Sequence, residues 1–303
     1  MITAGRADLA SWGRLIGTGP DLLDLVHRLS TGDVQGLTEG EGRPTVLTTA
    51  KGRIVERLSV HHLGAAGVLL LCGPGAASKV LAHLARYTFS EALGLTDVTG
   101  TTAAHVLFGT EWEDAARSAG LPVPPPYGAA AAAIAGADVH VLRTNGFDAD
   151  GLVVVGPASA GEAIGGALGA APASAEAFEA WRIVRGAPLS GRELTEDHNP
   201  LEAGLLDAVS FTKGCYVGQE VVARLRTYDK VSRRLVRLSL DPAAPPPRPG
   251  ARILAEGREV GSITSAAAGA ALGYVKVREL PAETIRVVLD DGAGTSDATI
   301  VTP

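Results

Sequence analysis

The stretch at 241–250 constrains the architecture of this chain more than any other. It reads Asp-Pro-Ala-Ala-Pro-Pro-Pro-Arg-Pro-Gly. Because proline has a fixed φ and no backbone donor, this stretch predicts a linker. Short strand-like runs without helical periodicity follow it, at 252–255, 259–264, 273–277 and 284–289. Such runs are typical of a small barrel or sandwich, so we predict a body at 1–240 and a β-domain at 241–303.

The body alternates predicted strands with predicted helices, which favours an α+β fold. Strands are expected at 45–48, 53–60, 68–72, 105–109, 139–143 and 152–155. Helices are expected at 20–29, 78–85, 111–119, 159–168 and 174–184. The alanine-rich run at 129–135 fits either a helix or filler.

Composition narrows the class of protein. Of 303 residues, 46% are hydrophobic and 20% charged, which is enough to build a sizeable core. The net charge of −6 gives no global argument for nucleic-acid binding. No apolar run approaches the ~20 residues that span a bilayer, and residues 1–14 do not resemble a signal peptide. We therefore expect a cytoplasmic protein without membrane contact.

The sequence contains no recognised motif for a metal site or for a serine nucleophile. Its seven histidines include no HExxH pattern, and the chain has no CxxC, Walker loop or GxSxG. His61 and His62 are adjacent on a predicted strand, so they face opposite ways. We predict no metal site.

The two cysteines differ in their surroundings. Cys72 ends an apolar run and is expected in the core. Cys215 lies in the octet at 213–220, Lys-Gly-Cys-Tyr-Val-Gly-Gln-Glu. Lys213 precedes the thiol by two residues, and a nearby cation favours the reactive thiolate. Packing beneath a turn is the other interpretation of Cys215, and the residues leave both open.

Basic residues are concentrated after the octet. Residues 213–237 contain seven basic and two acidic side chains. A solvated strand face would explain this run, and so would a positive surface for a polyglutamylated cofactor or RNA.

Three segments together resemble the YgfZ family, folate-binding relatives of the glycine-cleavage T-protein. They are 181–188, Trp-Arg-Ile-Val-Arg-Gly-Ala-Pro; 199–205, Asn-Pro-Leu-Glu-Ala-Gly-Leu; and the octet. Weaker matches cover most of the chain. The resemblance implies a three-part disc around a central channel that holds tetrahydrofolate, with a C-terminal β-barrel.

The chain departs from the transferase pattern at three acidic positions. An Asp-Asp pair after the hairpin glycine is replaced by Glu56-Arg57, and arginine cannot take up a proton. A pteridine-holding Glu falls on Ala149, and another Glu on Val184. Aminomethyl transfer is therefore not expected.

The resemblance implies a folate-binding accessory protein that supports iron–sulfur cluster assembly or repair in client enzymes and, through them, tRNA modification. The alternative is a folate-dependent one-carbon transferase or demethylase with an unknown substrate. A third hypothesis is direct tRNA contact through Arg224, Arg226, Arg233 and Arg234.

The resemblance also assigns residues to the site. Cys215 and Lys213 are expected to line the folate channel as the reactive pair. The residues expected to contact or position folate are Arg143, Arg182, Gly214, Tyr216, Gly218, Gln219 and Glu220.

Overall fold

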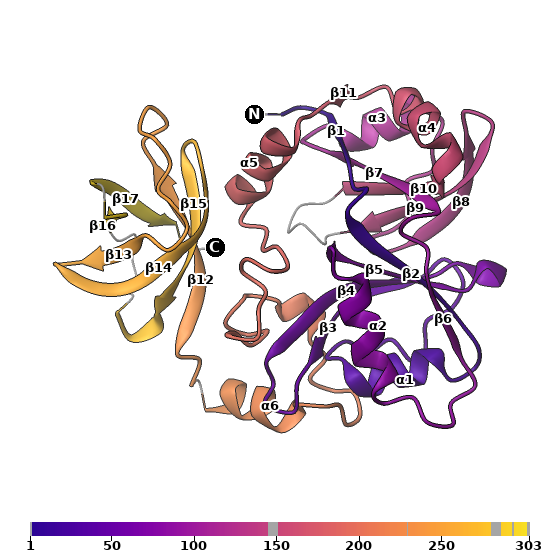
Figure 1. The fold of residues 1–303 in the computed structure, drawn as a ribbon, viewed down its shortest axis with the longest axis horizontal. Helices are drawn as coiled ribbons and strands as arrows, with labels where there is room; N and C mark the ends of the chain where they lie inside the picture. Colours follow the sequence, from indigo (N-terminus) through magenta and orange to yellow (C-terminus); the bar gives the residue numbers. More distant parts are fainter. Residues whose placement is uncertain (1, 145–150, 229, 280–285, 293, 302–303) are drawn as a thin grey trace.

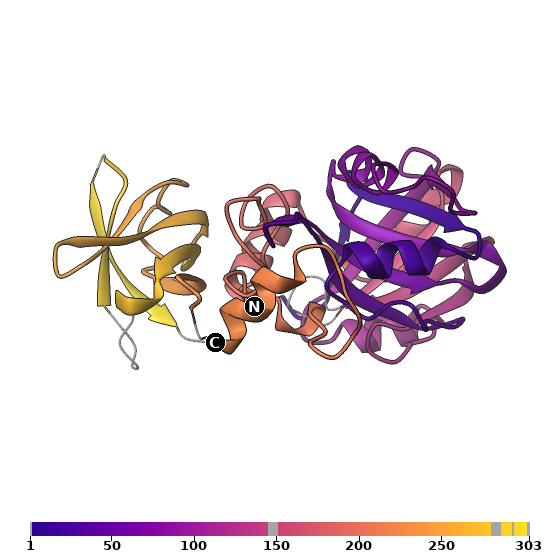
Figure 2. The same cartoon turned by 90° about the horizontal axis from the view of Figure 1, so that it is seen from below.

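The computed structural model describes residues 2–144, 151–228, 230–279, 286–292 and 294–301. They form two β-sheets with their helices and a closed β-barrel (Figure 1). The segment from 186 to 218 runs between the barrel and the sheets, and the view from below shows the same arrangement (Figure 2). No helix in these ranges is long and apolar enough to cross a membrane.

The five-stranded sheet has the order β3-β4-β5-β2-β6, with antiparallel neighbours throughout. Its strands are β2 (Trp12–Thr18), β3 (Gly42–Thr48), β4 (Ile54–His62), β5 (Val68–Pro74) and β6 (Gly94–Asp97). Two helices, α1 (Leu22–Leu29) and α2 (Ala77–Ala85), pack on one face. The predicted hairpin turn is confirmed, because Gly52 has a φ of +67° and donates to the Thr49 carbonyl.

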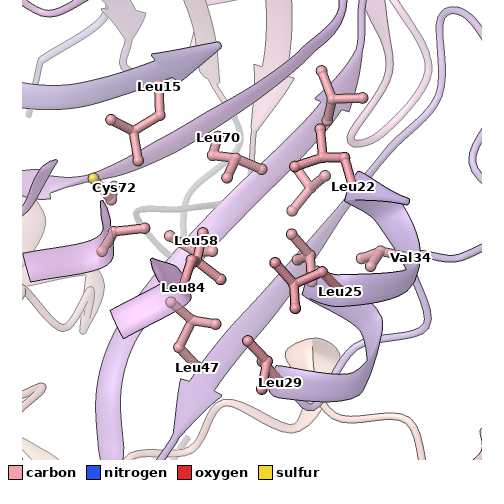
Figure 3. Packing of buried hydrophobic residues seen from close by; sticks show 14 of the residues in the cluster. Leu15, Leu22, Leu25, Leu29, Val34, Leu47, Leu58, Leu70, Cys72 and Leu84 are labelled. Atoms are coloured by element: carbon pink, nitrogen blue, oxygen red, sulfur yellow. The ribbon is translucent and has the colours of Figure 1, made fainter. Parts of the chain in front are cut away.

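The core of this sheet is built from side chains at helical spacing on α1. Leu22, Leu25 and Leu29 pack against Leu58 and Leu70 from the strands (Figure 3). Cys72 is buried in the same cluster, as predicted. Burial raises the pKa of its thiol to about 12, so the thiol stays protonated.

The six-stranded sheet has the order β11-β1-β7-β10-β9-β8. Its strands are β1 (Gly5–Asp8), β7 (Thr102–Phe108), β8 (Ala129–Ile134), β9 (Ala137–Thr144), β10 (Gly151–Pro157) and β11 (Ala171–Pro172). Its helices are α3 (Trp112–Ser118), α4 (Gly161–Ala167) and α5 (Ala175–Arg185). Short 3₁₀ turns, η1 to η4, occupy Gly64–Ala66, Ala158–Ala160, Leu206–Ala208 and Val277–Glu279.

The alanine-rich run proves to be the edge strand β8. It pairs with β9 through the two-residue turn Ala135-Gly136, where both residues have positive φ. This turn geometry matches the twist of an antiparallel hairpin. Pairing with β9 therefore overrides the helix propensity of alanine, because propensity is a weak preference beside tertiary contacts.

The C-terminal part is a closed six-stranded barrel, in the order β12-β15-β14-β13-β16-β17. Its strands are β12 (Arg233–Leu240), β13 (Arg252–Ala255), β14 (Arg258–Ala267), β15 (Ala270–Lys276), β16 (Arg286–Asp290) and β17 (Thr295–Val301). The predicted boundary at 241 is too late, because β12 pairs with β15 and β17. The proline-rich stretch connects two strands inside the barrel.

Candidate functional site

A small cavity lies where the two sheets meet the loop that follows α5. Trp12, Pro44 and Leu71 supply apolar wall from the five-stranded sheet, and Leu189 supplies it from the loop. Its volume is about 30 Å³, enough for a water molecule. In this conformation the cavity is therefore too small for a ligand much larger than water.

Strand β4 directs polar groups into this cavity. Successive side chains on a strand point to opposite faces. Leu58 and Val60 join the core beneath α1 and α2, whereas Arg57 and Ser59 line the cavity. The Arg57 side chain is only 7% exposed, and its Nη2 lies 3.5 Å from Asp207 Oδ2. A guanidinium thus stands in the wall, held by a carboxylate from the η3 turn.

Glu56 lines the cavity too, but its carboxylate is fully engaged. Oε2 lies 2.6 Å from Lys79 Nζ and accepts from the Ser190 hydroxyl at 2.6 Å. Oε1 accepts from the Gly73 backbone N–H at 3.2 Å. Gly73 is required here, because a Cβ would lie 2.4 Å from the Ser190 Cβ. Glu56 therefore closes the loop onto β5.

Lys213 is a structural lysine beneath the octet. Its Nζ donates to the carbonyls of His27, Ser30 and Gly32 at 2.6, 2.7 and 2.7 Å. Burial lowers its pKa to about 8, with Asp33 opposing the shift. These contacts satisfy carbonyls at the end of α1, which otherwise lack partners.

The middle of the octet ties two distant elements together. The Val217 N–H donates to the Arg28 carbonyl, and the Val217 carbonyl accepts from the Thr48 hydroxyl at 2.6 Å. Gly218 has a φ of +86°, and a Cβ there would lie 2.5 Å from the Thr49 carbonyl. A side chain at position 218 would therefore be strained, because of both the positive φ and the close carbonyl.

The other octet residues divide between core and solvent. The Tyr216 side chain is buried, and burial raises its pKa to about 12. Cys215 is exposed. Gly214 has no neighbour within 4 Å of a built Cβ, so no steric reason for this glycine exists in the described structure. Gln219 and Glu220 begin a helix that the sequence did not predict, α6 (Gln219–Thr227), in which Glu220 pairs with Arg224.

The structure does not bring Cys215 and Lys213 together in this cavity, and their expected place in a folate channel stays a prediction. Neither belongs to the cavity lining. The Lys213 ammonium points inward to backbone carbonyls, whereas the Cys215 thiol is exposed. The ammonium and the sulfur therefore lie in different environments.

Arg182 is also committed to structure. A guanidinium has five N–H donors. Those of Arg182 bond both Glu179 oxygens, the Ala187 carbonyl, Glu193 Oε2 and the Ser265 hydroxyl. No donor is left for a ligand, which corrects the predicted binding role.

Arg143 faces away from the cavity. It alternates with Thr144, which lines the cavity. Its Nη2 lies 3.0 Å from Glu113 Oε1, and its Cζ lies 5.2 Å from the Trp112 ring centroid. The described contacts of Arg143 therefore fix α3 rather than a cavity ligand.

The three positions at which the resemblance predicts a missing carboxylate do not all line the cavity. Arg57 is in its wall, but Val184 is 42% exposed on α5 and does not line it. Ala149 lies outside the described residues. The sequence analysis did not identify Lys79, Ser190 and Glu193. These residues form ion pairs or hydrogen bonds with residues that are distant in the chain. No local motif could have revealed these contacts.

Known proteins match both parts of the chain. Residues 2–213 match the model of the GCVT N-terminal domain, and residues 233–302 match that of the CAF17 C-terminal β-barrel domain. The second match begins at β12, in agreement with the barrel topology.

Two relatives illustrate the similarity. The chain is 31% identical over 296 residues to a chloroplastic protein of Arabidopsis thaliana that bears a provisional transferase name, covering 89% of this chain and 64% of that protein. It therefore spans less than two thirds of that relative's length. It is 29% identical over 280 residues to the aminomethyltransferase of Moorella thermoacetica, covering 89% and 76%.

A solved structure shows the same fold. The glycine cleavage system aminomethyltransferase T of Bartonella henselae superposes with a TM-score of 0.82 at 21% identity, over 99% of this chain and 86% of that one. The fold is that of an aminomethyltransferase-like protein, which confirms the expected α+β, T-protein-like fold with a C-terminal barrel. The chain belongs to the YgfZ/CAF17 family.

We expect Lys213→Met to destabilise the protein by about 2–4 kcal/mol, because three buried carbonyls lose their donor. Lys230→Met is the matched control, since Lys230 is exposed beside the Tyr228 ring. Denaturant unfolding measures both. Equal stability of the two variants would contradict the structural role of Lys213.

Proposed function

We propose that this protein is a folate-binding accessory protein that does not transfer aminomethyl groups. The observation that carries this proposal is Arg57 in the cavity wall. The resemblance places an essential transferase aspartate at that position, and a guanidinium can neither accept a proton nor stabilise a developing cation. Glu56 does not replace that acid, because Lys79, Ser190 and Gly73 already engage its oxygens.

The cavity lining suits a pterin in chemistry but not in volume. Trp12 and Leu189 offer flat apolar contact, and Arg57, Ser59 and Thr144 offer polar groups for ring edges. A volume of about 30 Å³ does not accommodate such a ring. Folate binding would therefore require the lining to open, and the loop at 187–194 is one boundary that could move.

Cys215 would act outside this cavity. Its exposed position suits contact with another protein better than contact with a ligand in the channel. In this proposal the thiol serves iron–sulfur client proteins, supporting cluster assembly or repair and, through them, tRNA modification.

Tetrahydrofolate is expected to bind the wild-type protein and quench Trp12, which lines the cavity. Arg57→Ala should weaken binding about tenfold, because charge-assisted hydrogen bonds to the ring would be lost. Calorimetry and intrinsic fluorescence together measure this. Trp12→Phe should reduce the quenching while calorimetry still records binding.

Arg53→Ala is the matched control for Arg57, since Arg53 precedes the same strand but does not line the cavity. Absence of folate binding to the wild type would contradict the proposal. Folate-dependent turnover of a methylamine substrate would favour the transferase or demethylase alternative.

Cys215→Ser is expected to abolish complementation in cells that lack the endogenous protein, measured as the activity of their iron–sulfur enzymes. Thr227→Ser is the control, because Thr227 is exposed at the end of α6 and lies outside the octet and the cavity lining. Thermal melts should show Cys215→Ser within about 0.5 kcal/mol of wild type, as for exposed substitutions generally. Full complementation by Cys215→Ser would exclude the thiol role.

A tRNA contact near α6 is the second candidate. Arg226 Cζ lies 3.6 Å from the Phe211 ring centroid, and Phe211 and Tyr228 are 38% and 65% exposed. Arginine beside exposed aromatic rings suits RNA, whose bases stack and whose phosphates are anionic.

If tRNA binds this surface, its affinity should fall steeply with salt concentration. Replacing both Arg233 and Arg234, which are exposed on β12, with glutamine should lower the salt slope by about two. An unchanged slope would remove these two arginines from the contact.

A further inference from the structure

Helix α5 carries an apolar stripe that lines a groove, and its Trp181 also packs against the Phe108 and Phe178 rings. Ala177, Ala180, Trp181 and Val184 recur at helical spacing and line a groove of about 950 Å³. The neighbouring residue Ile183 is fully buried against Ala270 and Leu272 of the barrel. One side of α5 therefore contacts the barrel, which lies beside this helix in Figure 1.

The groove continues into a second hollow between α5 and the barrel. The two share Val184, Arg185 and Arg237, and the second has a volume of about 410 Å³. Apolar side chains of β12 and β15, including Leu235 and Leu272, form its walls. Within the described ranges, Arg185 and Arg237 are the only charged residues that line it. The hollow therefore presents about as much polar as apolar surface, and its charged part is positive.

The guanidiniums of Arg185 and Arg237 differ in their hydrogen-bond contacts. Arg237 Nη1 donates to the Val184 carbonyl at 2.7 Å, which orients the group beside the hollow. Arg185 is exposed, and among the described residues its side chain has no ion-pair or hydrogen-bond partner. Guanidinium forks match oxyanions, and a volume of this size is typical of small-molecule sites.

We propose that this hollow binds a small amphipathic carboxylate. The carboxylate lies between Arg185 and Arg237, and the apolar body lies along Val184 and Leu235. The connected groove is also lined by Glu111, Glu113 and Asp114, and these carboxylates disfavour a dianion, so a monoanionic carboxylate fits better than a phosphate. The hollow shares no lining residue with the central cavity, so this site is separate from the proposed folate site.

The test is a calorimetric titration of the full-length protein with octanoate, using octanol, octylamine and octyl phosphate as comparators. Octanoate should bind at least about tenfold more tightly than octanol or octylamine, because only it combines the tail with an anionic head. Arg185→Gln and Arg237→Gln should each weaken octanoate binding about tenfold. Val184→Asp should abolish binding by placing a like charge at the head group.

Arg258→Gln is the matched control, since Arg258 is an exposed barrel arginine outside the hollow. Arg185 and Val184 are exposed, so their variants should fold normally, and melting curves check this. Octanoate binding that persists unchanged in both Arg185→Gln and Val184→Asp would overturn the site. Equal binding of octanol, or tighter binding of octyl phosphate, would overturn the carboxylate assignment.

Tetrahydrofolate distinguishes this site from the proposed folate site. Octanoate affinity should be the same with and without saturating tetrahydrofolate. Displacement of octanoate would show that the two ligands share one site and would overturn the separation. Failure of folate to bind leaves the octanoate titration and its arginine variants fully informative.

Discussion

The buried ion pair between Arg182 and Glu193 is the interaction on which the arrangement of the three parts depends. Arg182 extends from α5, and Glu193 belongs to the loop beside the cavity. Glu193 also accepts from Thr264 and Ser265 of β14. Breaking such a pair leaves an uncompensated buried charge, which is strongly destabilising. The same contacts that dock the barrel therefore hold the loop that closes the cavity.

That loop contacts both the residues that hold the barrel and the residues that line the cavity. Its Leu189 N–H donates to Glu193, and the next residue, Ser190, donates to Glu56 in the cavity wall. Glu56 is neutralised by Lys79, whereas the adjacent Arg57 keeps a cationic group in the wall. A transferase-like fold thus encloses a site whose ionic character differs from the pattern expected of the transferase.

The octet could be recognised from the sequence, but the contacts that its residues make could not be predicted from it. Lys213 and Cys215 are two residues apart, and the spacing suggested one reactive pair. Folding separates them, because the Lys213 ammonium satisfies carbonyls at the end of α1 while the thiol remains exposed. At Gly218 the positive φ and the close Thr49 carbonyl give a physical reason for a glycine in this loop. Arg182 was misassigned because its partners come from β14 and from the loop beyond α5.

The sequence by itself determined the family, the α+β body and the β-domain that follows it. These depend on local patterns: strand and helix periodicity, a proline-rich stretch and short motifs. Only the tertiary structure decided that the alanine-rich run is a strand, that the barrel begins at Arg233, and which charged groups are already paired. Strand pairing and ion pairing join residues far apart in the chain, so their energies are set by contacts that exist only after folding.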